Sequence, residues 1–206
     1  MHKRDFSAHH KRLFKKLNTP AKVQDFLNSI PQNFETDGQD TCRAPLGVMQ
    51  TKKAHCIEGA MLGAYILSLH GHVPLLMHLQ STKSDYDHVI APFKINGLWG
   101  ALSKTNHAVL RYREPIYKNI RELAMSYFHE YFTNDGKKTL RRYSEPLDLS
   151  LFVDDWMLEN GDVWGIDQEL DAVKHFDIAP RHAIKKYRKA DRIERTIGKF
   201  TEWKKR

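Results

Sequence analysis

The stretch AHCIEGAMLGAYILSLHG, at residues 54–71, decides the fold of this chain. Its apolar residues recur at helical spacing and form one stripe: Ile57, Ala60, Met61, Ala64 and Tyr65. Gly59 and Gly63 form a row of small residues along this helix, and each costs about 1 kcal/mol of helix stability relative to alanine. Their presence four residues apart predicts close packing against another element, and His70-Gly71 ends the helix.

Strand patterns follow this helix. Residues 73–79 are largely apolar and predict a buried strand. A second strand has alternating apolar residues on one face: Val89, Ala91, Phe93 and Ile95. His88 and Ile90 fall on its other face. Asn96-Gly97 is a strong hairpin signal, and residues 98–102 begin the return strand. Residues 55–106 therefore predict an α+β layer with an antiparallel sheet.

The rest of the chain is expected to be mainly helical. Thr19-Pro20 reads as a helix start and Pro31 as its end, and residues 32–47 read as a loop. Residues 116–132 predict one long helix, and 147–176 one or two more. Four segments result: a basic amphipathic segment at 1–18, a core at 19–113, a helical extension packed on it at 114–180, and a basic helix at 181–206.

Charge is concentrated at the ends of the chain. Residues 181–206 hold 11 Lys/Arg and three Asp/Glu, so they account for the whole net charge of +8. These basic ends could attract nucleic acid or an anionic surface, or could serve solubility alone. No stretch is apolar and long enough to span a bilayer, and no signal-peptide core is visible. With only two cysteines, we expect a cytoplasmic protein with free thiols.

Cys56 and His88 are the candidate nucleophile and base. Cysteine attacks carbonyl groups as the thiolate, and a helix N-terminus lowers the thiol pKa because it places partial positive charge beside the sulfur. Cys56 stands where the helical period begins, and His88 begins a strand predicted to face that helix. A Cys–His pair in this arrangement is typical of nucleophilic catalysis. The alternative is a small core cysteine, with Cys42 as a second structural thiol.

Three motifs in this order resemble the transglutaminase-like superfamily of the bacterial type. They are the helix from Ala54 to Gly71, the strand Asp87-His88-Val89, and the return strand GLWGAL at 97–102. The resemblance covers about residues 46–106. It implies an α+β, papain-like core, in which a nucleophile helix packs on an antiparallel sheet with added helices at both ends. It further implies a cysteine hydrolase or acyltransferase acting on peptide or protein amides through a thioester.

The third catalytic member departs from the family pattern. The aspartate expected four residues after Trp99 is replaced by Ser103, which can orient the imidazole but cannot stabilise its positive charge. Asn106 is a second candidate, although it falls on the opposite face of a straight strand. Gln50, six residues before Cys56, has the spacing of an oxyanion-hole glutamine in papain-type enzymes.

Two other functions remain open from the sequence. The missing aspartate also fits a catalytically weakened or inactive binding module, and the basic ends fit a nucleic-acid or anionic-surface binder. No zinc motif and no Gly-rich phosphate loop occurs, so neither a metal nor a cofactor is expected.

Overall fold

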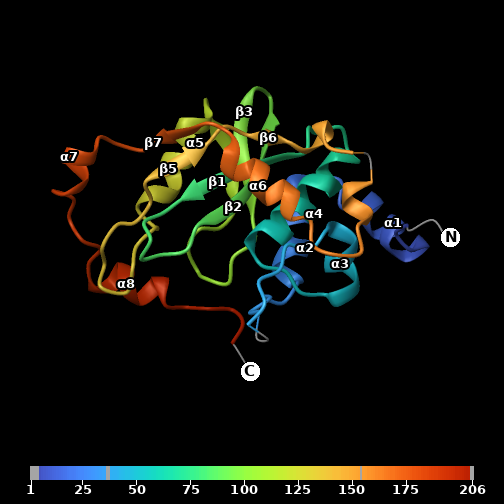
Figure 1. The fold of residues 1–206 in the computed structure, drawn as a ribbon, viewed down its shortest axis with the longest axis horizontal. Coiled ribbons are helices and arrows are strands. Elements are labelled where there is room, and N and C mark those ends of the chain that lie inside the picture. The colour runs from blue at the N-terminus through green and yellow to red at the C-terminus, as the bar shows by residue number, and fades with distance from the viewer. Residues whose placement is uncertain (1–4, 36–37, 154, 205–206) are drawn as a thin grey trace.

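The computed structural model describes residues 5–35, 38–153 and 155–204 and shows an α+β architecture (Figure 1). Its α-helices are α1 (Ala8–Lys16), α2 (Pro20–Ser29), α3 (Pro45–Thr51), α4 (Cys56–Ser68), α5 (Ile120–Phe128), α6 (Trp164–Ala172), α7 (Arg181–Ile184) and α8 (Arg192–Gly198). Its strands are β1 (Leu75–Gln80), β2 (His88–Ile95), β3 (Leu98–Ser103), β4 (Arg113–Tyr117), β5 (Arg142–Ser144), β6 (Leu147–Asp148) and β7 (His175–Asp177).

The strands form one antiparallel sheet in the order β4-β3-β2-β1-β5-β7, with β6 paired to β1. Apolar side chains fill both faces. One core joins α2 and α4 to β2, and Figure 1 shows α1 to α4 gathered together beside the sheet. A second core lies under α5 and contains Ile90 and Ala101. The face of β2 opposite Val89 is therefore buried as well.

Local sequence signals explain the elements around the site. Thr19 caps α2 by accepting a hydrogen bond from the Lys22 amide at 3.3 Å. Asn96 and Gly97 both have positive φ angles, 50° and 82°, as a tight two-residue hairpin turn requires. Pairing then follows from that turn, with Ile95 opposite Leu98.

The two helical glycines mark where α4 touches β3. A Cβ atom at Gly59 would lie 2.4 Å from the Cβ of Lys104, and one at Gly63 would lie 2.7 Å from Leu102 Cδ1. The predicted close packing is thus a contact with the side chains of the return strand. This contact fixes the distance between the start of α4 and the end of β3.

The prediction of one long helix over residues 116–132 is wrong. Its first part belongs to β4, an edge strand that pairs with β3, and α5 begins only at Ile120. Pro115 lacks an N–H group, which an edge strand tolerates, and Asn119 caps α5 through the Glu122 amide at 2.9 Å. Residues 114–180 therefore contribute strands β4 to β7 to the main sheet as well as helices.

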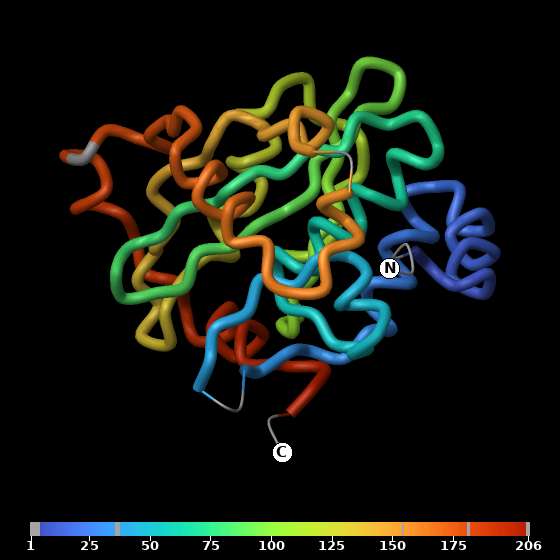
Figure 2. Tube along the Cα trace, turned by 45° about the vertical axis from the view of Figure 1, so that its right-hand side comes forward, coloured from blue at the N-terminus to red at the C-terminus, as the bar shows by residue number. Residues whose placement is uncertain are grey.

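Two further differences are smaller. The expected loop at 32–47 gives way to helix α3 at Pro45, a proline at the first helical position. The expected basic C-terminal helix is two short helices, α7 and α8. Figure 2 shows this segment returning along the body of the chain, where the amides of Ala108 and Glu202 bond Phe200 and Asn106 carbonyls. Within the described ranges, no helix is long and apolar enough to cross a membrane.

Gly59→Ala should lower the free energy of unfolding by about 1–3 kcal/mol, because the Lys104 Cβ cannot rotate away and the helix must move off the strand. Gly165→Ala in α6 is the matched control, since nothing lies within 4 Å of the added methyl group. It should leave stability unchanged or slightly raised. Urea unfolding measures both, and equal effects would contradict the close contact.

Candidate active site

Cys56 is the first residue of α4 and is partly buried. The amides of a first helical turn have no partner within the helix, so they place partial positive charge beside the thiol. The turn is held by Glu58, which is fully buried and accepts the His55 amide at 3.0 Å. Glu58 also accepts hydrogen bonds from Thr41 at 2.8 Å and from the Arg43 amide at 3.1 Å. The position of the nucleophile is therefore fixed by a satisfied buried carboxylate.

His88 begins β2, and its side chain is buried. Its Nε2 lies 2.8 Å from the hydroxyl oxygen of Ser103, the last residue of β3. The Ser103 hydroxyl in turn donates to the carbonyl of Leu110, a residue with a positive φ of 61°. Gln24 of α2 clamps the Ser103 backbone, with 2.9 Å bonds to both its N–H and its carbonyl.

This chain of hydrogen bonds selects one tautomer of neutral His88. The hydroxyl proton of Ser103 is given to Leu110, so the Ser103 oxygen is an acceptor toward the ring. Nε2 must then carry the ring proton, which leaves Nδ1 as the basic nitrogen. His88 also hydrogen-bonds the Cys56 side chain. The arrangement therefore presents a proton acceptor to the thiol.

The two cysteines have opposite electrostatic surroundings. Burial opposes ionisation of Cys56, but hydrogen bonds from His55 and His88 and the charge on those rings outweigh it and hold the thiol pKa well below its ordinary value. For Cys42, burial and the nearby Asp167 and Glu58 carboxylates raise the pKa to about 12. Cys42 is fully buried, so Cys56 is the reactive thiol of the pair.

The structure separates the two candidates for the third member. Ser103 contacts His88, as described above, whereas the side chain of Asn106 bonds the backbone N–H and carbonyl of Trp203 at 2.8 and 2.9 Å. Gln50 lies on α3 with an exposed side chain and lines neither cavity beside Cys56. Among the predicted site residues, the structure brings together Cys56, His88 and Ser103.

Two residues near the nucleophile were not predicted as members of the site. His55 hydrogen-bonds Cys56, and its Nε2 lies 2.7 Å from the Thr41 carbonyl. Glu58 bonds the His55 backbone, as described above. The sequence carries a signal for this pair, because an acidic residue three positions after a helix N-cap is a capping pattern. Histidine is an uncommon helix N-cap, so the pattern alone does not indicate that this pair belongs to the site.

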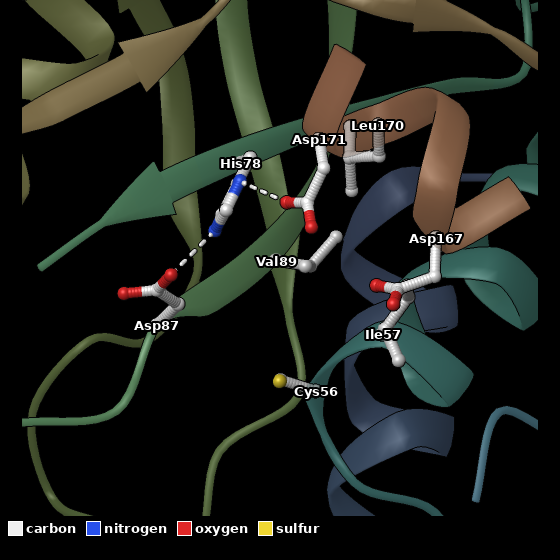
Figure 3. Close-up of a pocket in the computed structure, with 8 residues that line it drawn as sticks. All are labelled: Cys56, Ile57, His78, Asp87, Val89, Asp167, Leu170 and Asp171. Carbon is white, nitrogen blue, oxygen red and sulfur yellow. Dashed lines mark hydrogen bonds and ion pairs between the residues drawn. The ribbon is translucent and has the colours of Figure 1, made fainter. Parts of the chain in front are cut away.

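Cavities open on both sides of the thiol. The larger, of about 950 Å³, includes His55, His88, Lys104 and Arg195 in its lining. A smaller one of about 280 Å³ includes Asp167, and only Cys56 and Asp87 line both. In the smaller cavity, Figure 3 shows the Cys56 sulfur at one end and His78 between Asp87 and Asp171 at the other.

His78 is occupied by its neighbours in that cavity. Its Nε2 lies 3.0 Å from Asp87, and its Nδ1 lies 3.3 Å from Asp171 and 3.2 Å from His175. Because both ring nitrogens have partners, His78 ties the loop before β2 to α6. In the part of the chain that the structure describes, no group of three or more His, Cys, Asp or Glu residues is arranged to hold a metal ion.

No protein-family model matches the sequence, and a search of curated proteins finds no significant match. The relationship to the transglutaminase-like superfamily therefore stays a prediction from the three motifs described above.

Ser103→Ala should slow iodoacetamide labelling of Cys56 near neutral pH about fivefold, the equivalent of one lost hydrogen bond of about 1 kcal/mol. The imidazole then loses the acceptor that fixes its tautomer. Ser103→Thr keeps the hydroxyl and should restore the rate. Asn106→Ala is the matched control, because its side chain holds Trp203 instead of His88. Slower labelling in Asn106→Ala alone would assign the third position to Asn106.

Proposed function

We propose that this chain is a cysteine enzyme that acts on amide bonds, with a transglutaminase-like, papain-type core. The observation that carries the proposal is the thiol of Cys56, which stands at a helix N-terminus and hydrogen-bonds a histidine whose far nitrogen is held by Ser103. The order of nucleophile helix, histidine strand and return strand supports the same conclusion. Cavities on both sides of the thiol would accommodate a chain that runs past it.

The proposed cycle uses only residues of this site. Nδ1 of His88 takes the thiol proton, and the Cys56 sulfur attacks the amide carbon. The backbone N–H of Cys56 would donate to the oxyanion. His88 then gives its proton to the leaving amine as the carbon–nitrogen bond breaks, which leaves a thioester. Water or a second amine attacks the thioester, His88 accepts the attacking group's proton, and the thiol is restored.

The replacement of the expected aspartate by Ser103 favours one competing function, a binding module that keeps the core without turnover. A hydroxyl orients the ring but adds no negative charge to stabilise an imidazolium. The two functions differ in the ionisation of Cys56, since a retired site has no need of a thiolate at neutral pH.

Iodoacetamide labelling of the folded protein tests the proposal directly, because Cys42 is buried with a raised pKa and only Cys56 should react. The depressed pKa of Cys56 means that its thiolate persists as pH falls, so the rate at pH 6 should stay within about threefold of the rate at pH 8. An ordinary thiol, with a pKa of about 8.5, loses nearly tenfold per pH unit over this range. Titration of accessible Cys56 near pH 8.5 would favour the binding module.

Acylation gives the second measurement. p-Nitrophenyl acetate should transfer its acetyl group to Cys56, where peptide mapping after an acid quench would locate it. Cys56→Ala should remove the adduct, and His88→Ala should slow both its formation and its loss at least 100-fold, as expected for a missing general base. Adding a primary amine then separates hydrolysis from transfer, because only a transferase converts the thioester into the acetylated amine faster than into acetate.

A further inference from the structure

His55 directly precedes Cys56, and its ring is held by hydrogen bonding on the side away from the thiol. Its Nε2 lies 2.7 Å from the Thr41 carbonyl, so this nitrogen carries a proton. The same nitrogen lies 3.5 Å from the carboxylate of Glu35 and 3.6 Å from that of Glu58. The ring also hydrogen-bonds the Cys56 side chain. One face of His55 thus meets acceptors and negative charge, and the other meets the thiol.

The acidic groups of the site are distributed unequally between the two histidines. Of the two histidines that hydrogen-bond Cys56, His55 has two carboxylates within 4 Å of a ring nitrogen, those of Glu35 and Glu58. The partner of His88 Nε2 is the neutral hydroxyl of Ser103. Ser103 replaces the aspartate that the family resemblance leads one to expect. Negative charge that would stabilise an imidazolium is therefore present in the site, but it surrounds the other ring.

We propose that His55 is a standing imidazolium that keeps Cys56 in its thiolate form, while His88 alone transfers protons during the reaction. This inference rests on the proposed function and assigns a second histidine to it. His55 is protonated before the substrate arrives and stays protonated throughout. The proton that leaves the Cys56 thiol is held by His88 before the substrate arrives and passes from there to the leaving amine, so the proton count of the cycle is unchanged.

The electrostatic surroundings of His55 are consistent with a lasting charge. Burial lowers its pKa, but the bonds and charges of Cys56, Glu58 and Thr41 outweigh burial and raise the pKa to about 9. Positive groups also lie near the site. They are His88 of β2, Lys104 just after β3, and Arg43, whose guanidinium lies 3.6 Å from the Glu58 carboxylate. Burial lowers the pKa of Lys104 to about 8, so this lysine still carries its charge at pH 6, and its ammonium group donates to the Ile30 carbonyl. Asp167 of α6 adds a further negative charge within range of the ring.

His55→Asn tests the proposal, because asparagine is a favoured helix N-cap and the bond from the residue 55 amide to Glu58 is a backbone bond that survives. Loss of the imidazolium should raise the thiol pKa, so labelling of Cys56 at pH 6 should slow at least tenfold while the rate at pH 9 stays within about twofold of wild type. His182→Asn on α7 is the matched control, since that histidine is exposed and outside both cavities, and its profile should match wild type.

Turnover of p-nitrophenyl acetate separates the two histidines. His55→Asn should be slow at pH 6 and recover toward the wild-type rate at pH 9, because high pH makes the thiolate without help. His88→Ala should not recover, because deacylation still lacks its base. A merely structural role for His55 would give a defect of the same size at both pH values, and that result would overturn the proposal.

Glu35→Gln tests the role of His55 independently if the His55→Asn protein proves unstable. It removes the charge 3.5 Å from His55 but keeps an oxygen to accept the Thr41 amide, so labelling at pH 6 should slow several-fold. An unchanged profile in both variants, with wild-type Cys56 still reactive at pH 6, would refute the role of His55 and leave the proposed function standing. An ordinary thiol profile in the wild type would refute the proposed function, and the role of His55 with it.

Discussion

The contact between α4 and β3 is the constraint on which the rest of the site depends. Gly59 and Gly63 admit side chains of β3 and of the residue after it, Leu102 and Lys104, closer than any other residue type would. Ser103 lies between Leu102 and Lys104 in sequence. Residues 102–104 therefore set both the distance of α4 from the sheet and the orientation of His88. A helix displaced from the strand by one methyl group would move the sulfur away from the imidazole. The geometry of the candidate site and the packing of the core therefore depend on the same contact, which the glycines permit at a cost in helix propensity.

Buried charge at the start of α4 is balanced locally. Glu58 is fully buried, which would be costly for an unpaired carboxylate. It accepts hydrogen bonds from Asn33, Thr41 and the backbone of Arg43, in addition to its bond with the helix cap. The loop before α3 supplies most of these donors, which gives that polar segment a structural purpose. The arrangement places a negative charge in the first turn of α4, two residues after Cys56 and 3.6 Å from the His55 ring.

Sequence reasoning worked where the signal was local. The cap at Thr19, the Asn96-Gly97 turn and the period of α4 each depend on a few neighbouring residues, and each element forms where the sequence predicts it. The prediction of a helix directly after Arg113 failed. The apolar residues there fit helical spacing, but pairing with β3 makes this segment the strand β4. Edge pairing is a tertiary interaction that periodicity does not contain. Strands of two or three residues, such as β5 to β7, are too short to give any pattern.

The same distinction applies to the site. The pairing of Cys56 with His88 follows from elements that the sequence predicts, so both residues could be named in advance. The sequence could not choose between Ser103 and Asn106 as the partner of His88, because the contacts that separate them come from distant parts of the chain. The Asn106 side chain hydrogen-bonds the backbone of Trp203, near the far end of the sequence. The Ser103 hydroxyl donates to the carbonyl of Leu110. Such long-range hydrogen bonds have no signature in residue spacing.

The position of the basic C-terminal segment in the fold also changes how its charge is interpreted. From the sequence it is a charge run free to bind nucleic acid, but the folded chain packs it beside the candidate site. Arg195 and Gly198 line the larger cavity, and the His107 ring bonds the Gly198 carbonyl at 3.0 Å. Part of its positive charge is paired within the chain, since Lys189 lies 2.8 Å from Asp135 and Arg188 lies 3.3 Å from Asp191. A segment held in this way forms part of the wall of the larger cavity, and Arg195 places one of its positive charges there.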